Sequence, residues 1–488
     1  MKPRFFILIG IWLVIAGRAF AFVQATNTFS TDGSWADVKA ACYAATNSGS
    51  IVTIPAGTFT WGDDGVPLYL SSKMTLWGAG TNLTTVHIQI QNAFAFDTGM
   101  IQIFGPVVVG NFAVNFTANN NTTLISANGT DWRVTQLFYD GTGDGGQRFV
   151  SVLAGGDRGL IDHCSITAGG YGSDELIFLQ GPTDAWQQPD ALGTTNAVYI
   201  ENCQFWADGY VCDANANARV VVRFCTINGV MKVDGHGKWS NTPARSCRVV
   251  ESYCNHWTSI GQSGSWDSIE LRGGTGILFS NTVDDGTFGG RGIIQLAEYG
   301  SISSGGGGAW FGVCQTPTYY PVDDQVGVGQ DPKSAGSAPV YLWGNTKNGV
   351  AQILSWKDIA AAGIQQYTNE TGNTASTYTM QDIIKADRDY FNQTNSFTGS
   401  SGVGVGTKAA MLAITGTKVG VGYWVTDEGN WNSTAPTNSS GQLYTWNGST
   451  WALKYAPLTY PFAAVANLVT QASPPATNSP VRYYLFLK

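Results

Sequence analysis

Ionisable side chains gather between residues 232 and 298, in a chain where they are otherwise scarce. Charged residues make up 12% of the 488 residues, about half the roughly 25% usual for soluble domains. The stretch holds the segments KVDGHGKWSNTPAR, IELRGG and VDDG, which mix acids and bases. Such mixtures suit acid–base catalysis or the binding of a charged substrate, whereas the plain alternative is a set of exposed turn residues. The side chains concerned are Lys232, Asp234, His236, Lys238, Arg245, Asp267, Glu270, Arg272, Asp284, Asp285, Arg291 and Glu298.

The overall composition excludes several classes of protein. The chain has 61 Gly, 17 Trp, 20 Tyr and 23 Phe, and a formal net charge of −8. Disorder driven by net charge and a coiled coil do not fit this composition. The acidic balance and the lack of basic runs argue against nucleic acid as a partner. The eight Cys include no Cys-x-x-Cys pair, so zinc is not expected.

The first 21 residues have the pattern of a secretory signal peptide. Lys2 and Arg4 precede an apolar run at 5–16, and Ala-Phe-Ala at 19–21 fits a cleavage site. The apolar run is shorter than the ~20 residues of a membrane span. We therefore expect a secreted protein, extracellular or periplasmic, with no membrane contact after cleavage.

The scaffold that positions the charged side chains is indicated by a repeated strand pattern. The segments LIDHCSI, YIENCQF and VVRFCTI share an apolar pattern around Cys164, Cys203 and Cys225. Asn255 and Asn281 take the equivalent places further along, at intervals between 22 and 39 residues. A repeat of this kind, with one strand and one turn in common, is typical of a solenoid. We expect an all-β parallel β-helix in which these Cys and Asn stack as a packing ladder.

Further elements divide the chain into parts. The helical spacing of residues 34–45, with Ser34 as N-cap, predicts a helix that covers the N-terminal end of the solenoid. Helical spacing recurs at 355–367 and 381–393, and Asn447-Gly448 indicates a type I′ hairpin between short aromatic strands. We expect a signal peptide at 1–21, a β-helix domain at 22–350, a helical or irregular extension at 351–415 and a small C-terminal β appendage at 416–488.

The segments WADVKAA, IVTIPAGTF and MTLWGAG, within residues 35–86, resemble the N-terminal cap and first turns of the pectate-lyase-like, right-handed parallel β-helix superfamily. With the repeated strands, the resemblance covers residues 34–350. It implies a scaffold that carries lyases, hydrolases, esterases and non-enzymatic adhesins. LIDHCSI also resembles the Trp-Ile-Asp-His strand of pectate lyases, which implies that Asp162 binds calcium, the one cofactor expected.

The resemblance further implies a lyase that cleaves uronate-containing polysaccharide by β-elimination. That reaction needs the uronate carboxylate neutralised and a base that takes the adjacent C–H proton. From loosely similar motifs, the implied catalytic residues are Arg272, Lys232 and His236. The implied substrate-binding residues are Asp234, Lys238, Arg245, Asp284, Asp285 and Arg291.

Two other functions stay open. Polygalacturonases on this scaffold use several carboxylates and a Gly-His-Gly motif, and the chain has Gly-His-Gly at 235–237 and Asp-Asp at 284–285. Hydrolysis with inversion would need Asp234 and one of these Asp about 6.5–9.5 Å apart. A non-catalytic surface or carbohydrate-binding protein would instead use the 17 Trp and other aromatic residues to bind sugar faces. In each case we expect a monomer.

Overall fold

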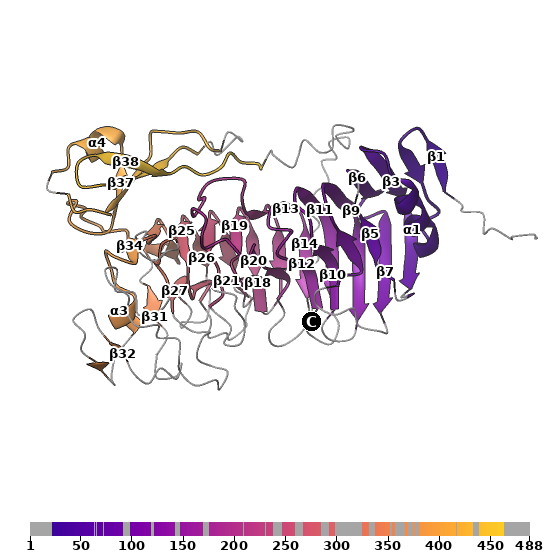
Figure 1. Ribbon diagram of the computed structural model, residues 1–488, viewed down its shortest axis with the longest axis horizontal. Helices are drawn as coiled ribbons and strands as arrows, with labels where there is room; N and C mark the ends of the chain where they lie inside the picture. Colours follow the sequence, from indigo (N-terminus) through magenta and orange to yellow (C-terminus); the bar gives the residue numbers. More distant parts are fainter. Residues whose placement is uncertain are drawn as a thin grey trace, which may run out of the picture.

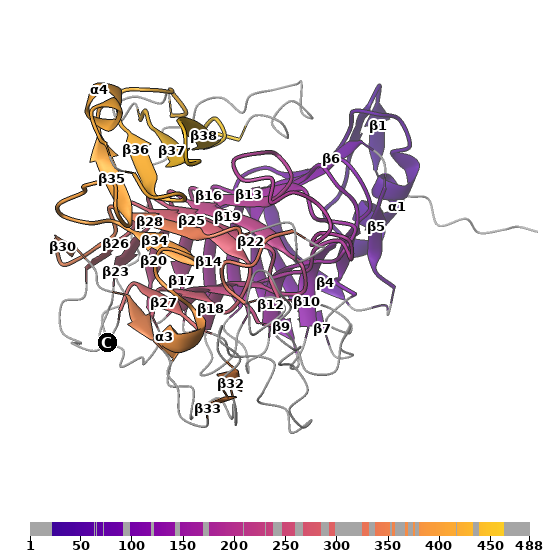
Figure 2. The same ribbon diagram turned by 60° about the vertical axis from the view of Figure 1, so that its left-hand side comes forward.

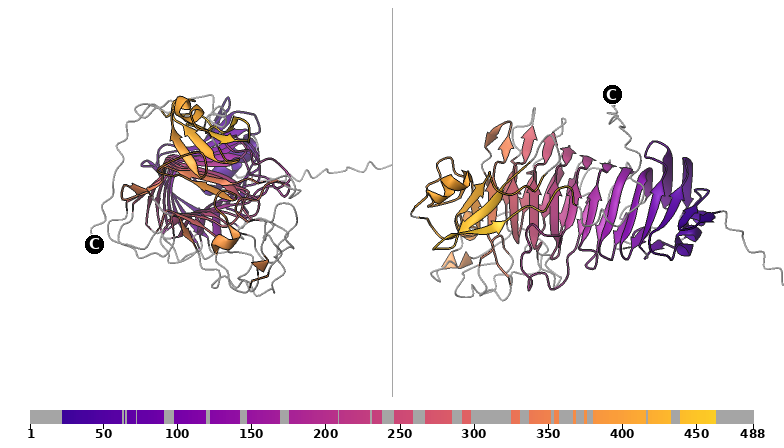
Figure 3. Two further views of the ribbon diagram at one scale, coloured as in Figure 1. Left: turned by 90° about the vertical axis from the view of Figure 1, so that its left-hand side faces the viewer. Right: turned by 90° about the horizontal axis from the view of Figure 1, so that it is seen from above.

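The computed structural model shows an all-β protein built from long sheets of parallel strands (Figure 1). The strands stack along the long axis, from an N-terminal helix at one end to a C-terminal sheet at the other (Figure 3). Among the described residues, no helix is long and apolar enough to cross a membrane. The residues that the structure describes are 22–62, 64, 66–71, 73–90, 98–118, 122–141, 147–168, 175–207, 209–229, 231–237, 246–258, 267–284, 292–297, 325–330, 337–351, 354–356, 367–368, 374–375, 380–415, 417–432 and 439–462.

Two sheets, which we call sheet A and sheet B, hold most of the strands. Sheet A has 22 strands: β1 (Val23–Ala25), β2 (Thr28–Ser30), β3 (Ser50–Ile54), β4 (Gly57–Gly62), β6 (Met74–Gly78), β7 (Thr84–Ile90), β9 (Val107–Ala118), β11 (Trp132–Gly141), β13 (Gly159–Asp162), β14 (Ser165–Ala168), β16 (Val198–Glu201), β17 (Gln204–Trp206), β19 (Arg219–Arg223), β20 (Thr226–Asn228), β22 (Val249–Tyr253), β23 (His256–Thr258), β25 (Thr275–Phe279), β26 (Thr282–Asp284), β28 (Val340–Trp343), β29 (Thr346–Lys347), β30 (Val350–Ala351) and β34 (Tyr390–Asn392). Sheet B has 10 strands: β5 (Leu68–Leu70), β8 (Ile101–Ile103), β10 (Thr122–Ala127), β12 (Gln147–Val152), β15 (Ile177–Leu179), β18 (Gly209–Ala214), β21 (Met231–Gly235), β24 (Ile269–Leu271), β27 (Ile294–Leu296) and β31 (Ser355–Trp356).

The chain passes through these sheets in a regular circuit. Sheet A consists of two strips of parallel strands that run side by side. The long strands β9 and β11 join the strips, because one half of each pairs with strands of the first strip (β6 and β13) and the other half with strands of the second (β7 and β14). From β12 to β29 the chain visits sheet B, the first strip and the second strip in turn. Each strand pairs in parallel with its counterpart one circuit later, as β13 does with β16 and β14 with β17. Residues at equal positions in the circuit therefore lie side by side.

A sharp bend separates the two strips in each circuit. The bend residue has a positive φ, a backbone conformation that is unfavourable for every residue except glycine. It persists because the paired strands on both sides fix the direction of the chain. The bend residues are His163, Asn202, Phe224, Cys254, Ser280 and Gly344, with φ between 52° and 66°.

The predicted ladder of Cys and Asn is confirmed. The three predicted Cys are buried free thiols, and each follows a bend residue. Asn255 continues the row, since its Oδ1 accepts a hydrogen bond from the Cys225 N–H (3.0 Å) and its Nδ2 donates to Asn281 Oδ1 (3.1 Å). Asn281 Nδ2 in turn donates to Asn345 Oδ1 (2.9 Å). The ladder thus satisfies polar groups inside the core as well as filling space.

The predicted N-terminal helix is confirmed as α1 (Trp35–Ala44). Ser34 is its N-cap, and the Ser34 Oγ accepts a hydrogen bond from the Asp37 N–H (3.3 Å). Val38 and Cys42 are buried in the main core. The helix contacts β3, β4 and β5, so it covers the N-terminal end of the sheets.

The helix predicted at 355–367 is wrong at both ends. Its first two residues form β31, and its last residue begins β32 (Tyr367–Thr368), which pairs with β33 (Thr374–Ala375). Residues 357–366 lie outside the described part of the chain. Trp356 suits a strand because aromatic side chains pack well on a pleated surface.

The helix predicted at 381–393 is reduced to the four-residue α3 (Met380–Ile383). The rest of this segment ends in β34, which pairs in parallel with β28. Sheet A therefore continues past the domain boundary that we predicted at residue 350. The residue pattern misled because Tyr390 and Phe391 belong to a strand of the main sheet.

The C-terminal sheet has four strands, β35 (Val403–Gly406), β36 (Gly422–Val425), β37 (Gln442–Trp446) and β38 (Trp451–Tyr455), with helix α4 (Lys408–Leu412) beside them. It begins before the predicted boundary at residue 416. The predicted hairpin is confirmed between β37 and β38, but its loop has four residues and is not a two-residue type I′ turn. Asn447 Oδ1 shapes the loop by accepting hydrogen bonds from the N–H groups of Ser449 and Thr450 (both 2.9 Å).

The segment after β38 lies on the outer side of sheet A (Figure 2). The buried Arg223 donates to the carbonyl oxygens of Leu458 (2.7 Å) and Thr459 (3.3 Å). Glu251, also buried, accepts a hydrogen bond from the Tyr455 hydroxyl (2.7 Å). Charged side chains of sheet A thus fasten the C-terminal segment to the middle of the molecule.

Candidate functional site

A patch of buried ionisable side chains lies on the outer face of sheet B. β18, β21 and β24 pair in register, so that Asp213, Asp234 and Glu270 stand side by side. The residue before each of these carboxylates fills the hydrophobic core. Because side chains alternate along a strand, the carboxylates face outward. They are nevertheless at most 3% exposed.

Two cations pair with these carboxylates. The Arg272 guanidinium donates to Asp234 Oδ2, and the Lys232 ammonium pairs with Glu270 and lies 3.8 Å from Asp234 Oδ1. Burial alone would lower the pKa of Lys232 and of Arg272, but Asp234 and Glu270 raise both above their usual values. Burial alone would raise the pKa of Asp234, but Arg272 and Lys232 hold it below its usual value. Lys232, Arg272 and Asp234 are therefore ionised at neutral pH.

Asp213 and Glu175 are two carboxyl groups with raised pKa values at the edge of the patch. Burial, and then the charge of Asp234, raise the pKa of Asp213 to about 7. Burial, and then the charge of Asp213, raise the pKa of Glu175 to about 7, although Arg148 pairs with it. Both groups change charge near neutral pH.

His236 directly follows β21 and is buried beside the carboxylates. Its Nδ1 lies 2.6 Å from the carbonyl oxygen of Gly237, which fixes Nδ1 as the proton-bearing donor. Nε2 then carries the lone pair of the neutral ring. Burial, and then the charge of Arg272, lower the pKa of His236 to about 4. The neutral imidazole therefore prevails at pH 7.

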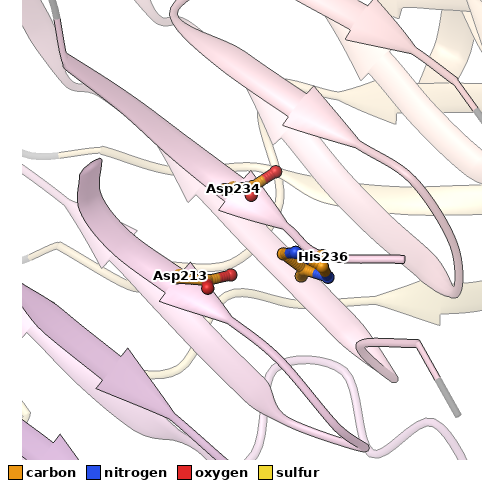
Figure 4. Close-up of side chains that lie close together, drawn as sticks. All are labelled: Asp213, Asp234 and His236. Atoms are coloured by element: carbon orange, nitrogen blue, oxygen red, sulfur yellow. The ribbon is translucent and has the colours of Figure 1, made fainter. Parts of the chain in front are cut away.

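Asp213, Asp234 and His236 could together hold a metal ion. Each offers one ligand atom, and these atoms lie within 4.8 Å of one another. Figure 4 shows the two Asp on neighbouring strands and His236 just beyond the end of the second strand. Carboxylate oxygens and an imidazole nitrogen are both common ligands of divalent metal ions.

Aromatic side chains border the patch. The Lys232 Nζ lies 4.6 Å from the centre of the Tyr210 ring, and burial raises the pKa of Tyr210 to about 12. The Arg148 guanidinium lies over the ring of Phe178, 3.9 Å from its centre. The polar patch thus runs across several strands of sheet B, along the long axis of the molecule.

Four residues predicted from the sequence lie in this patch: Lys232, Asp234, His236 and Arg272. Asp284 does not belong to it. It lies on β26 in sheet A with 65% of its side chain exposed, and His256 Nε2 is 2.9 Å from its Oδ2. Asp234, on β21 of sheet B, and Asp284, on β26 of sheet A, therefore lie on different sheets. Lys238, Arg245, Asp285 and Arg291 lie outside the described residues.

The expected calcium ligand Asp162 lies on β13 in sheet A, away from sheet B. Arg133 donates to both of its carboxylate oxygens (2.8 and 2.7 Å). His163 Nδ1 is 2.6 Å from Asp162 Oδ2. Burial alone would raise the pKa of Asp162, but Arg133 and His163 hold it below its usual value. Asp162 is thus a member of a buried ion pair with Arg133.

Asp213, which stacks on Asp234 in sheet B, was not predicted from the sequence. A usable signal existed, because the two Asp are 21 residues apart and Cys203 and Cys225 are 22 residues apart. Nearly equal spacing within one circuit predicts that the two Asp lie side by side. Glu270 was noted among the charged side chains of this stretch but was given no role, although it is two residues from Arg272, a spacing that places two side chains on one face of a strand.

Comparisons with known proteins leave the site to be interpreted from its geometry. No family model matches the chain, and no curated protein matches it. Among solved structures it is similar to ORF18 of Geobacillus virus E2, with 12% identity, 53% of each chain covered and a TM-score of 0.27. The chain thus spans about half the length of that protein. A likeness at this level supports no conclusion about fold or function.

Proposed function

We propose that the protein is a secreted, right-handed parallel β-helix of the pectate-lyase-like type that acts on acidic polysaccharide. The circuit through sheet B and the two strips of sheet A supports this scaffold, because each strand pairs in parallel one circuit ahead. The stacked bends and the Cys and Asn ladder support it further. In such a scaffold, the outer face of sheet B can accommodate an extended polymer.

The proposed reaction is β-elimination across a uronate unit. The observation that carries it is the convergence of Lys232, Arg272 and buried carboxylates on one face of sheet B. A uronate carboxylate could take the place of Asp234 or Glu270 as partner of these cations, since both cations bind carboxylates through charge-assisted hydrogen bonds. Neutralising that carboxylate acidifies the adjacent C–H group and stabilises the charge that develops there.

The side chains of the patch divide the work of elimination. Arg272 binds the uronate carboxylate through its planar fork of donors. Lys232, which like Arg272 stays cationic at neutral pH, neutralises the uronate carboxylate, and the carboxylate that the uronate displaces from these cations takes the C–H proton. Tyr210, whose pKa is raised to about 12, keeps its proton at neutral pH and can deliver it to the leaving oxygen. His236 faces the two Asp and takes no part in this proton transfer.

Incubation of the purified protein with a panel of uronate-containing polymers tests this function. Elimination produces an unsaturated uronate, which absorbs in the near ultraviolet. We expect this absorbance with the native protein and its loss with Lys232→Met. Lys418→Met is the control, because Lys418 is half exposed on the C-terminal part of the chain. New reducing ends without the absorbance would replace elimination by hydrolysis.

A non-catalytic carbohydrate-binding protein is the second candidate. One observation favours it: the cations of the patch already have buried carboxylate partners. A buried network of paired charges can exist for structural reasons alone. Polymer binding by the native protein, with neither absorbance nor new reducing ends across the whole panel, would select this candidate over the lyase.

A further inference from the structure

We propose that Asp213, Asp234 and His236 bind one divalent transition-metal ion such as Zn²⁺, a property that does not depend on the elimination chemistry. Asp213 comes from β18 and Asp234 from β21, and His236 follows β21 directly (Figure 4). One ligand atom of each lies within 4.8 Å of the other two. Small adjustments would close this triangle on an ion whose bonds to nitrogen and oxygen are about 2.0–2.2 Å long.

His236 is oriented as a metal ligand usually is. Its Nδ1 donates to the carbonyl oxygen of Gly237 (2.6 Å), and Nε2 is then the coordinating nitrogen. Metal-bound His residues almost always donate their other ring N–H to a carbonyl, a carboxylate or water, which fixes the tautomer and the ring plane. The backbone thus holds His236 in the form that a metal ion requires.

The two carboxylates supply an independent observation. Oδ1 of Asp213 and Oδ1 of Asp234 are buried and have no hydrogen-bond partner, in side chains at most 1% exposed. Their other oxygens are engaged, since Asn215 Nδ2 donates to Asp213 Oδ2 (3.4 Å) and Arg272 donates to Asp234 Oδ2. The Lys232 ammonium, 3.8 Å from Asp234 Oδ1, is beyond hydrogen-bond distance. A metal ion would satisfy both buried oxygens, which are costly to leave unpaired.

The donor set favours a transition metal over calcium. Calcium takes six to eight oxygen ligands, whereas imidazole nitrogen suits zinc and other late first-row ions. Three protein ligands also leave a coordination position open, as in catalytic zinc sites. Our expectation of no zinc rested on the missing Cys-x-x-Cys pair, and this ligand set uses no Cys.

Calorimetric titration of the chelator-treated, full-length protein with Zn²⁺ and with Ca²⁺ tests the site. We expect one Zn²⁺ per chain, bound more tightly than Ca²⁺. His236→Ala should weaken Zn²⁺ binding at least 100-fold. Asn215→Ala keeps all three ligands, removes one outer hydrogen bond and should weaken binding about 10- to 100-fold. The absorption spectrum of bound Co²⁺ should show nitrogen and oxygen ligands and no thiolate.

His256→Ala is the matched control, because His256 is paired with Asp284 in an exposed place on sheet A. It should leave the affinity unchanged, and circular dichroism should show that each variant is folded. No Zn²⁺ binding, equal loss in the two His variants, or tighter Ca²⁺ binding that His236→Ala leaves intact would overturn the proposal. These measurements use no polysaccharide, so their failure and the failure of the lyase function are told apart.

Discussion

Arg272 is the side chain whose shape matters most for the proposed reaction. Arg272→Lys keeps the positive charge beside Asp234 but loses the planar fork that holds a carboxylate. We expect kcat/KM for formation of the unsaturated product to fall at least about 30-fold, which corresponds to roughly 2 kcal/mol of transition-state stabilisation. Initial rates at several polymer concentrations measure this change.

The control for this substitution is Arg158→Lys. Arg158 forms an ion pair with Asp131 in which both side chains are about one-third exposed. Arg158→Lys should have the same rate as the native protein within experimental error, because exposed ion pairs contribute little to stability. Equal rates for Arg272→Lys and the native protein would remove Arg272 from the mechanism.

Glu251 makes the stability of the protein depend on pH. Burial raises its pKa from 4.5 to about 7, although hydrogen bonds from Gly193 and Tyr455 lower it. Between pH 4.5 and 7 the folded state then binds more protons than the unfolded state, so the free energy of unfolding falls as pH rises. The contribution of Glu251 to this fall is on the order of 2–3 kcal/mol.

Glu251→Gln should remove that contribution, because the amide does not ionise and still offers an oxygen to Gly193. Urea titrations at pH 4.5, 6 and 7.5 measure the change, and we expect a smaller fall in stability than for the native protein. Glu428→Gln, at a partly exposed ion pair with Lys408, is the control. If the two variants and the native protein lose the same stability between pH 4.5 and 7.5, Glu251 is not the cause.

At the scale of elements, the bends between the two strips carry a local cost. Ser280 has a φ of 52°, whereas the equivalent place in the next circuit is occupied by Gly344. A left-handed conformation costs a non-glycine residue roughly 1–2 kcal/mol in the folded state, and glycine avoids this cost. Glycine also has more freedom in the unfolded state, which offsets about 0.5–1 kcal/mol of the gain. Ser280→Gly should therefore raise the free energy of unfolding by about 0.5–1 kcal/mol, as measured by chemical denaturation.

Ser280→Val tests the same argument in the opposite direction. A β-branched side chain tolerates positive φ least, so this variant should lose more than about 1 kcal/mol. The strands on either side would be unchanged. A stabilising effect of valine would show that the bend is not strained.

Some elements could be predicted from the sequence because their pattern is local. α1 was predicted from the Ser34 cap and its apolar spacing, and the ladder from Cys and Asn at equal places in the repeat. The helix predicted at 381–393 failed because Tyr390 and Phe391 are fixed by pairing with β28, which local spacing does not report. Pairing partners far apart in the sequence decided the outcome there.

At the scale of the whole molecule, the residues of the site also fall into those with a local sequence signal and those that only long-range strand pairing brings together. Lys232, Asp234, His236 and Arg272 were predicted because charges stand out in a chain that has few of them. Asp284 was grouped with them from the sequence, but it lies on sheet A, because proximity in the sequence does not tell which sheet a strand joins. Asp213 could have been found only by aligning whole circuits.

Export is a prediction that concerns the whole chain. We expect cleavage after Ala21, so that secreted protein begins with Phe22. The Phe22 nitrogen donates to Asp37 Oδ1 (2.9 Å), and Asp37 is 4% exposed. Cleavage would turn this nitrogen into an ammonium group and strengthen the bond to the carboxylate. N-terminal sequencing of secreted material checks the site, and an uncleaved N-terminus on a membrane-bound product would contradict it.

The fastening of the C-terminal segment to sheet A determines how the molecule would bear a mechanical load. Arg223 and Glu251 hold residues 455–459 at β19 and β22, several circuits before the last one. A pull on the C-terminus would therefore reach the middle of the sheets first and bypass the final circuits. Those circuits would peel away one after another only once the fastening had broken, since each strand is bonded to its neighbours one circuit away. Resistance to force would thus begin at the buried side chains of sheet A that hold the C-terminal segment, among them Arg223, Glu251 and Glu201, whose carboxylate accepts a hydrogen bond from the Phe462 N–H (2.9 Å). The final circuits would extend the molecule only after these bonds had broken.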